Sequence, residues 1–268
     1  MAKKNSQTLP KEVTQKLAEN WQRCRQENLP ALFYAYDEKE SQGERIVTFR
    51  LDRDKLQELY DDVTDQGSLQ FIVHLGMTDE SIPEQIPDIP PFVLLLQASE
   101  KKTDFQENCF LLNWAPNGRF TTYEESDPTS GENAIPAASA YLFVMSWMET
   151  AEEDLAMPFT AGSHVLGKRV KNYRFSNAES ISIYKDIKAT LKSDLPRLDI
   201  HMGNGLAVYD HPFSFRPVIE VRNAVNVDEN GSLVEPTTNG RSATGLVNGY
   251  GDSFYDFGAP EPPPQPEG

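Results

Sequence analysis

The stretch Leu69-Gln-Phe-Ile-Val-His-Leu-Gly76 places apolar side chains at every second position and ends at a glycine. This alternation predicts a β-strand with one face in the core. The stretch Leu198-Asp-Ile-His-Met-Gly203 has the same alternation, with a histidine and a glycine 127 positions after those of the first stretch. Two strands of matching pattern indicate an internal repeat, and this repeat decides the fold that we expect.

Matches on both sides of the two strands support the repeat. Identities are few, but the matched positions keep their order over more than 80 residues while the offset drifts between 124 and 127. The matches are Leu9-Pro10 with Ile135-Pro136, Trp21 with Trp147, Phe33 with Phe159, Phe49-Arg50-Leu51 with Tyr173-Arg174-Phe175, and Pro91-Phe92-Val93 with Pro217-Val218-Ile219. We therefore expect two homologous units, residues 8–125 and residues 134–235.

Each unit is expected to combine helices with strands. Val13, Leu17 and Trp21 form an apolar stripe at helical spacing in the first unit. The corresponding helix after Pro136 is apolar on all sides, so we expect it to be buried centrally or between the units. Ser176-Asn-Ala-Glu179 is a capping box at the start of a further helix. The layout predicts an α+β fold, a tandem duplication of a small domain with helices on one face of a mainly antiparallel sheet.

The predicted strand Phe92–Ala98 is apolar on both faces. In the alignment above, Leu94 and Leu96 stand where the second unit has Glu220 and Arg222. A strand without a polar face needs a cover on each side. We therefore expect the second unit, or another subunit, to pack against Leu94 and Leu96.

Residues 236–268 differ in composition from the rest of the chain. They are rich in glycine and proline, with five prolines among the last nine residues, which predicts a flexible, disordered tail. Phe254, Tyr255 and Phe257 are the exception, because aromatic side chains contribute large apolar contact areas. We expect this segment to dock in an apolar groove at Leu94 and Leu96, on this subunit or an adjacent one, while residues 262–268 stay mobile.

The charge of the chain restricts its partners. There are 41 acidic and 25 basic residues, which gives a net charge of −16 without any basic cluster that would form a groove. Such a surface repels nucleic acids and anionic lipids. The longest apolar run, residues 134–148, is shorter than the roughly 20 residues that span a membrane. We therefore expect neither nucleic acid nor membrane as a partner.

The location that we expect is cytoplasmic. No apolar segment follows Lys3-Lys4, so a secretory signal is not predicted. Cys24 and Cys109 are the only cysteines and form no CxxC motif, which favours reduced thiols in a cytoplasmic setting.

One constellation resembles a metal site. Asp199 and His201 lie two residues apart, so their side chains point to the same face of a strand, and His211 follows after a short excursion. Aspartate and histidine ligands of this kind occur in hydrolytic and oxygenase metal centres. The first unit has Ile72 in place of Asp199, so the fold does not require the cluster. A metal-dependent enzyme using Asp199, His201 and His211 is therefore one alternative.

The familiar catalytic signatures are absent from the chain: GxGxxG after a strand, the P-loop, HExxH and GxSxG. The favoured hypothesis is a non-enzymatic structural or interaction protein without a cofactor, which self-associates or docks to a protein partner. A binder of a small ligand in the cleft between the units is a further alternative.

The second unit resembles a group of uncharacterised bacterial proteins. The resemblance rests on the helix that carries Trp147, the strand that ends at Gly203, the Asp-rich turn Val225-Asn-Val-Asp-Glu-Asn-Gly231, and the tail Tyr255-Asp-Phe-Gly-Ala-Pro-Glu-Pro-Pro263. It covers about 120 residues. Members of the group tend to carry cysteine beside the tail prolines, and this chain has none there. The resemblance implies no activity and therefore no catalytic residue.

Overall fold

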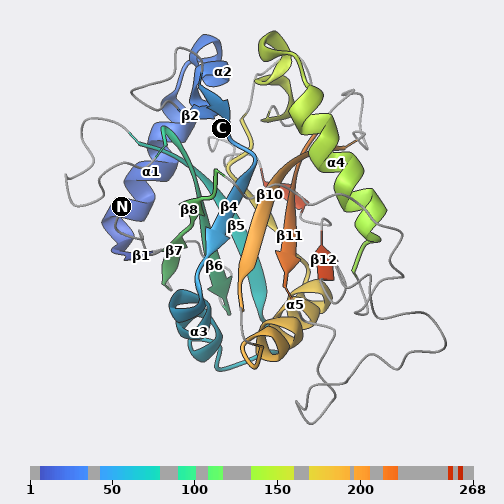
Figure 1. Ribbon diagram of the computed structural model, residues 1–268. Helices are drawn as coiled ribbons and strands as arrows, with labels where there is room; N and C mark the ends of the chain where they lie inside the picture. The colour runs from blue at the N-terminus through green and yellow to red at the C-terminus, as the bar shows by residue number, and fades with distance from the viewer. Residues whose placement is uncertain are drawn as a thin grey trace, which may run out of the picture.

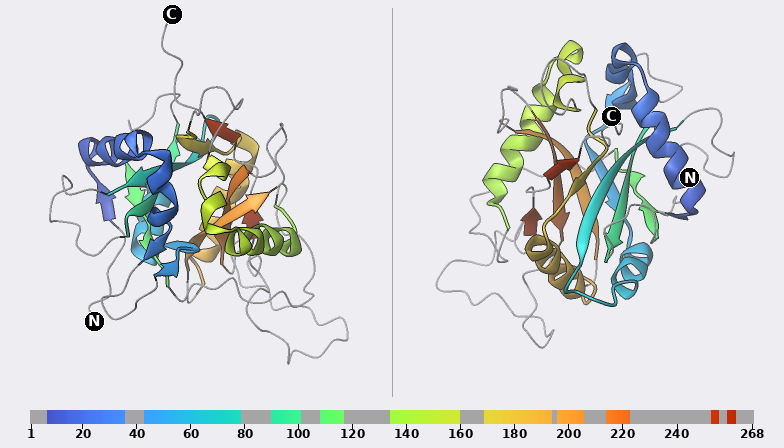
Figure 2. Two further views of the ribbon diagram at one scale, coloured as in Figure 1. Left: turned by 90° about the horizontal axis from the view of Figure 1, so that it is seen from above. Right: turned by 180° about the vertical axis from the view of Figure 1, so that it is seen from behind.

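The computed structural model describes residues 7–35, 43–78, 90–100, 108–116, 134–159, 169–193, 196–205, 214–222, 253–255 and 259–261. These residues form a mixed α+β fold in which two antiparallel sheets enclose one apolar core (Figure 1). A long helix lies against the outer side of each sheet, as the views from above and from behind show (Figure 2). None of the helices in these ranges has the length and the apolar character needed to cross a membrane.

The larger sheet has six strands in the order β1-β7-β6-β5-β9-β13. Its central pair, β5 and β6, is in register over eight residues, with Val73 opposite Leu96 and His74 opposite Leu95. The strands are β1 (Gln7–Leu9), β5 (Gln70–Met77), β6 (Phe92–Ser99), β7 (Cys109–Leu111), β9 (Asn172–Arg174) and β13 (Ala259–Glu261).

The smaller sheet has five strands in the order β12-β11-β10-β4-β8. Its central pair also holds eight residues in register, with Ile200 opposite Ile219 and His201 opposite Val218. The strands are β4 (Thr48–Leu51), β8 (Asn113–Trp114), β10 (Leu198–Gly205), β11 (Ser214–Val221) and β12 (Ser253–Tyr255). A short separate hairpin joins β2 (Tyr34–Ala35) to β3 (Glu44–Arg45).

The two sheets exchange strands: β4 and β8 of the first half lie in the five-stranded sheet, and β9 and β13 of the second half lie in the six-stranded sheet. β4 belongs to the first half of the chain, yet it pairs with β10 in the five-stranded sheet. β9 belongs to the second half, yet it pairs with β5 in the six-stranded sheet. The sheets therefore do not follow the predicted boundaries 8–125 and 134–235, since each sheet takes strands from both ranges.

The helices α1 (Lys11–Arg23) and α4 (Ala137–Glu149) occupy corresponding places on the two sheets. Each contacts its sheet beside a glycine. A Cβ atom on Gly76 would lie 2.8 Å from Val93 and 3.2 Å from the Leu17 Cβ of α1, and one on Gly203 would lie 3.1 Å from the Phe143 Cβ of α4. The glycines that end the two sequence patterns therefore allow helix and strand to approach closely.

Two further helices close one end of the sheets, α3 (Arg53–Asp61) and α5 (Asn177–Thr190) (Figure 1). The predicted capping box is confirmed: the Ser176 hydroxyl accepts from the Glu179 amide, and the Glu179 carboxylate accepts from the Ser176 amide. At the other end of the sheets the chain forms short turns, namely η1 (Gln26–Asn28), α2 (Leu29–Leu32), η2 (Glu152–Asp154) and η3 (Met157–Phe159).

Aromatic side chains fill the core between the sheets. Trp21 and Trp147 are fully buried, as their positions in the sequence pattern predict. The Trp21 indole packs edge to face on Phe92 and on Phe159, with ring centroids 5.4 and 5.3 Å apart. Phe159 in turn stacks on Phe215 at 4.6 Å. Rings therefore occupy the described part of the space in which a small ligand between the halves would have to bind.

Two sequence-based expectations differ from the structure. The apolar helix α4 is not central, because it lies on the outside of the five-stranded sheet with Leu142 64% exposed. The range 236–268 is not uniformly flexible, because residues 253–255 and 259–261 form paired strands. Residues 262–268 lie outside the described ranges.

Candidate functional site

A buried group of charged side chains lies on the five-stranded sheet, on the face turned away from the core. Its centre is Asp199 of β10, whose side chain is only 1% exposed. Arg50, opposite Asp199 on the exchanged strand β4, donates through Nε to Oδ1 at 2.7 Å and through Nη2 to Oδ2 at 2.9 Å. This two-bond geometry is the strongest form of an ion pair in proteins, and here it joins the two halves of the chain.

The same face carries a chain of hydrogen bonds through His201. The Nδ1 atom of His201 lies 3.0 Å from the Thr48 hydroxyl, and its Nε2 atom lies 2.6 Å from a carboxylate oxygen of Glu220. A hydroxyl, an imidazole and a carboxylate in this order resemble the arrangement that activates a nucleophile. Thr48 is fully buried, however, so its oxygen has no access to a substrate in this structure.

Arginines surround the two carboxylates of this group. Besides Arg50, the Nε of Arg197 lies 3.4 Å from Asp199, and the Nε of Arg222 lies 2.8 Å from Glu220. The hydrogen bond to Asp199 raises the pKa of Arg50 above its usual value, despite the opposing effect of burial. Burial lowers the pKa of Arg197. Three guanidinium groups thus face two carboxylates, and the group carries no excess of negative charge.

This charge balance does not fit a metal ion. The ligand atoms of Asp199, His201 and Glu220 lie within 4.8 Å of one another. The Asp199 oxygens accept from Arg50, while Glu220 forms an ion pair with Arg222 and lies against His201, so cationic side chains already neutralise the carboxylates that a metal ion would need. His211, the third ligand expected from the sequence, lies outside the described residues. We derive no metal chemistry from this group.

The corresponding place on the six-stranded sheet lacks the two carboxylates, although Arg174 lies opposite Ile72 as Arg50 lies opposite Asp199. His74 corresponds to His201, and its Nε2 lies 2.8 Å from the Gln97 side-chain oxygen. The strand register pairs Ile72 with Gln97 and Asp199 with Glu220, so Gln97 corresponds to Glu220. The sequence alignment of this strand was therefore wrong by three residues.

In the corrected register, Leu94 and Leu96 no longer correspond to Glu220 and Arg222. The sequence therefore no longer indicates an extra apolar face that needs a cover. Leu94 and Leu96 face the central core and are fully buried, in line with Val73 and Phe110. The tail does not dock there. Phe254 and Tyr255 belong to β12, which pairs with β11 on the other sheet, and Phe257 lies outside the described residues.

The two described tail aromatics are buried on opposite faces of β12. Phe254 packs with Ile135 and Val218 beneath α4. Tyr255 points into the central core, and its hydroxyl donates to Asp186 Oδ2 of α5 at 2.5 Å. Burial raises the pKa of Asp186 and, together with the negative charge of Asp186, raises the pKa of Tyr255.

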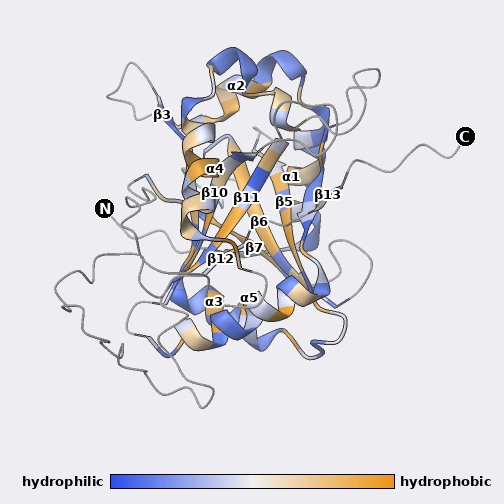
Figure 3. Ribbon diagram, turned by 90° about the vertical axis from the view of Figure 1, so that its right-hand side faces the viewer, coloured by the Kyte–Doolittle hydropathy of each residue, from blue (hydrophilic) through white to orange (hydrophobic). Residues whose placement is uncertain are grey.

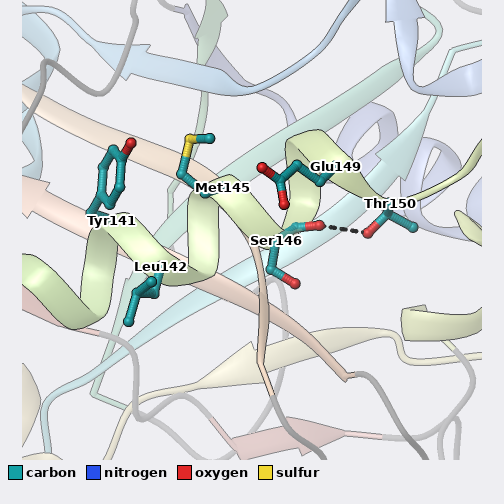
Figure 4. Close-up of a pocket in the computed structure, with 6 residues that line it drawn as sticks. All are labelled: Tyr141, Leu142, Met145, Ser146, Glu149 and Thr150. Atoms are coloured by element: carbon teal, nitrogen blue, oxygen red, sulfur yellow. Dashed lines mark hydrogen bonds between the residues drawn. The ribbon is translucent and has the colours of Figure 1, made fainter.

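Of the three large apolar side chains that are exposed among the described residues, Leu142 and Met148 lie on α4 and Met157 lies on η3. Tyr141, Leu142, Met145 and Met148 lie on the outer side of α4, and we call these four residues the α4 surface. Leu142 is 64% exposed and Met148 is 48% exposed. Figure 3 colours the ribbon of α4 and the other elements by hydropathy. A concavity of about 560 Å³ lies along the helix (Figure 4). It is lined by Tyr141, Leu142, Met145, Ser146, Glu149 and Thr150.

The backbone beneath the α4 surface is held firmly at its C-terminal end. The Thr150 hydroxyl donates to the Ser146 carbonyl at 2.7 Å (Figure 4). Arg45 of β3 donates through Nη1 to the carbonyls of Trp147, Met148 and Thr150 at 2.7 to 3.2 Å. These bonds satisfy carbonyls that have no partner within the helix. The concavity therefore lies on a fixed helix end rather than on a loop.

The helix α1 shows that the fold does not need apolar residues on the outer side of these helices. At the constant offset of 126, Gln15, Lys16, Glu19 and Gln22 of α1 stand at the positions of the α4 surface. The α4 surface was not predicted from the sequence, because an apolar helix is typically a buried one. Aligning α1 with α4 position by position reveals it, since the two helices differ in polarity at these positions.

No family model, no curated protein and no solved structure matches the chain. The candidate sites therefore have to be judged from their own chemistry.

Proposed function

We propose that the protein is a non-enzymatic interaction protein that docks a protein partner through the α4 surface. The observation that carries the proposal is the contrast between the helices: the same place in the fold bears polar residues on α1 and exposed apolar residues on α4. Large exposed apolar side chains that gather on one helix are typical of interaction sites. Methionine favours such a role because its flexible side chain adapts to different partners.

The buried charged group is assigned a structural role within this proposal. Arg50 of the exchanged strand pairs with Asp199, Arg222 pairs with Glu220, and the hydroxyl of Thr48 is enclosed. Such a group specifies which strand pairs with which, a role that buried ion pairs have in some proteins.

We further propose that the chain arose by duplication of a unit whose strands exchange, as in an intertwined dimer. Equivalent helices, strand registers and histidines in the two halves support this origin. So do two hydrogen bonds of the same kind: Trp21 Nε1 donates to the Val170 carbonyl at 2.8 Å, and Trp147 Nε1 donates to the Ile46 carbonyl at 2.9 Å.

A photo-crosslinking experiment tests the docking function. Benzoylphenylalanine is placed at Met148 of α4 and, in a matched control, at the corresponding Gln22 of α1. We expect a discrete adduct from position 148 that is lost when Leu142→Lys is added, and no such adduct from position 22. Equal adducts from both helices, or an adduct unaffected by Leu142→Lys, would contradict the proposal. An adduct of twice the chain mass would identify self-association as the form of docking.

A further inference from the structure

The charged residues next to α4 in the sequence are acidic, whereas two arginines that contact the helix in the fold, Arg45 and Arg216, are engaged with its terminal carbonyls and with the Phe143 ring. No charged residue occurs from residue 133 to residue 148, and Glu149 then ends the helix. Glu152 and Glu153 follow on η2, and all three glutamates are exposed. Over the longer range 120–167 the sequence contains eight acidic residues and no lysine or arginine. The apolar helix thus lies within an acidic stretch of the sequence that contains no lysine or arginine.

Arg45, a cation at the C-terminal end of α4, already has hydrogen-bond partners within the chain. The Arg45 guanidinium donates to carbonyls at the end of α4 and to the hydroxyl of Tyr34 at 2.6 Å. It fixes the helix end, while Glu149 lines the concavity itself. A ligand of the α4 surface therefore meets apolar side chains along the helix and carboxylates at its C-terminal end.

We propose that the occupant of the α4 surface is a basic amphipathic segment of another protein, a conclusion that rests on the docking function proposed above. Its apolar side chains, three or four residues apart, would lie on Leu142, Met145 and Met148 in the manner of a helix in a groove. Its lysine or arginine side chains would face Glu149, Glu152 and Glu153. Charge complementarity of this kind steers association and selects partners.

The same charges argue against a second copy as the occupant. Two chains each carry a net charge of −16, and each brings the exposed Glu149, Glu152 and Glu153 to a contact between two α4 helices. Like charges placed together across an interface disfavour the complex.

The size of the surface sets the expected affinity. A helix of 13 residues is about 20 Å long, enough for a partner helix of about three turns. Such a contact falls below the roughly 1,200 Å² of a stable interface, so the complex is transient. Its dissociation constant is expected on the order of micromolar and should rise with salt concentration.

Peptide display tests the chemistry of the partner while the partner itself is still unidentified. A library of random peptides, each of about three helical turns, is selected on the full chain. A variant with Leu142→Lys, Met145→Glu and Met148→Gln, the residue types of α1, serves for counter-selection. We expect the enriched peptides to carry net positive charge and apolar residues at helical spacing, and to bind the variant at least about tenfold more weakly, a difference of about 1.4 kcal/mol.

The outcomes separate the inference from the function on which it rests. Enriched peptides that need the α4 surface but are neutral or acidic would overturn the basic partner and leave docking intact. If the selection enriches no peptide whose binding depends on the α4 surface, both the basic partner and the docking function are overturned. Sedimentation of the chain alone, and flotation with neutral phosphatidylcholine vesicles, provide two further readouts. Self-association or vesicle binding that is lost in the triple variant would assign the surface to a second copy or to a membrane and overturn the basic partner.

Charge variants test the acidic end directly. Glu149→Gln, Glu152→Gln and Glu153→Gln together remove three charges beside the α4 surface. Glu12→Gln, Glu19→Gln and Glu27→Gln remove three exposed charges from α1 and η1 as a matched control. We expect the first variant to weaken binding of an enriched peptide about tenfold and to reduce its salt dependence, while the control leaves both unchanged. Equal effects of the two variants would show that only the overall charge of the chain attracts the peptide.

Discussion

Phe33 stacks face to face on Phe159, with ring centroids 5.0 Å apart and planes inclined by 11°. The two residues hold equivalent positions in the two halves, 126 residues apart. The two rings therefore bring the two halves of the chain into contact within the core. Because Trp21 and Trp147 also pack on this pair, the halves share one centre rather than two separate cores.

Removal of either tryptophan should destabilise the chain to a similar extent. Trp21→Ala and Trp147→Ala each leave a cavity in the shared core, which costs roughly 3–5 kcal/mol. Equilibrium unfolding in urea, followed by far-UV circular dichroism, measures the loss. A loss under about 1 kcal/mol at either position would show that the two indoles are not equivalent in the core. Exposed Gln26→Ala provides a control on the same side of the fold.

Neither half of the chain should fold alone. A fragment that ends before residue 120 lacks β9 in its main sheet, and a fragment that begins after residue 120 lacks β4. We expect each fragment to unfold without cooperativity and the equimolar mixture to regain the spectrum and the melting transition of the intact chain. A cooperative transition in one isolated fragment would contradict the shared core.

The helix cap and the buried tryptophans could be predicted from the sequence because each depends on local pattern. The exchange of β4 and β9 could not, because alternation identifies a strand without identifying its neighbour. Thr48 and His201 are 153 residues apart, and nothing near either residue in the sequence refers to the other. The register of β6 relative to β11 could not be predicted either. The sequence alignment matched Glu220 with Leu94, whereas the strand pairing matches it with Gln97, three residues further on.

The candidate sites could likewise be predicted only in part from the sequence. Asp199 and His201 could be placed on one strand face from their spacing, whereas Arg50 and Glu220 come from strands whose pairing was unknown. The exposure of α4 could not be inferred from its composition. An apolar helix predicts burial on several sides, and only the fold reveals that one side of α4 has a sheet beneath it while the other bears exposed Leu142.

Loss of the charge on Asp199 should be costly. Asp199→Asn leaves Arg50, Arg197 and Arg222 with Glu220 as their only carboxylate in the group, and breaking a buried pair in this way costs about 3–5 kcal/mol. Exposed Asp54→Asn removes the same charge from α3 and should change the free energy of unfolding by less than about 0.5 kcal/mol.

A double variant separates the pair from the individual charges. Arg50→Leu with Asp199→Ile removes both partners, and isoleucine is the residue at the matching place, position 72, of the other sheet. We expect this double variant to be more stable than Asp199→Asn alone, because no unpaired charge stays buried. Urea unfolding of the three proteins gives the comparison, and the reverse order would refute the structural role assigned to the group.

Truncation of the tail should destabilise both sheets. Deletion of residues 252–268 removes β12 from β11 and β13 from β9, together with the buried rings of Phe254 and Tyr255. Burial of an aromatic side chain contributes on the order of 2 kcal/mol, so we expect a lower melting temperature by calorimetry. The shorter deletion 262–268 leaves both β12 and β13 in the chain and is the matched control. Equal melting temperatures for the two deletions would contradict the pairing of β12 and β13.

The pH dependence of stability should contain a contribution from Asp186. Burial raises the pKa of this carboxyl above its ordinary value near 3.8, and the hydrogen bonds from Tyr255 and Ser253 counteract burial only in part. In the folded chain Asp186 therefore holds its proton to a higher pH than in the unfolded chain. Between the two pKa values the folded state binds more protons, so the free energy of unfolding decreases as the pH rises through this window.

Asp186→Asn should remove this decrease, because the amide keeps an oxygen for the Tyr255 hydroxyl and does not titrate. The stability of the variant relative to the natural chain should rise with pH, by about 1.4 kcal/mol for each unit that separates the folded and unfolded pKa values. Urea unfolding at a series of pH values above 3.8 measures the difference. Asp54→Asn removes a charge without touching the core and is the control. Curves for Asp186→Asn and the natural chain that stay parallel would mean that the carboxyl is solvated, and that Tyr255 does not hold β12 to α5 through it.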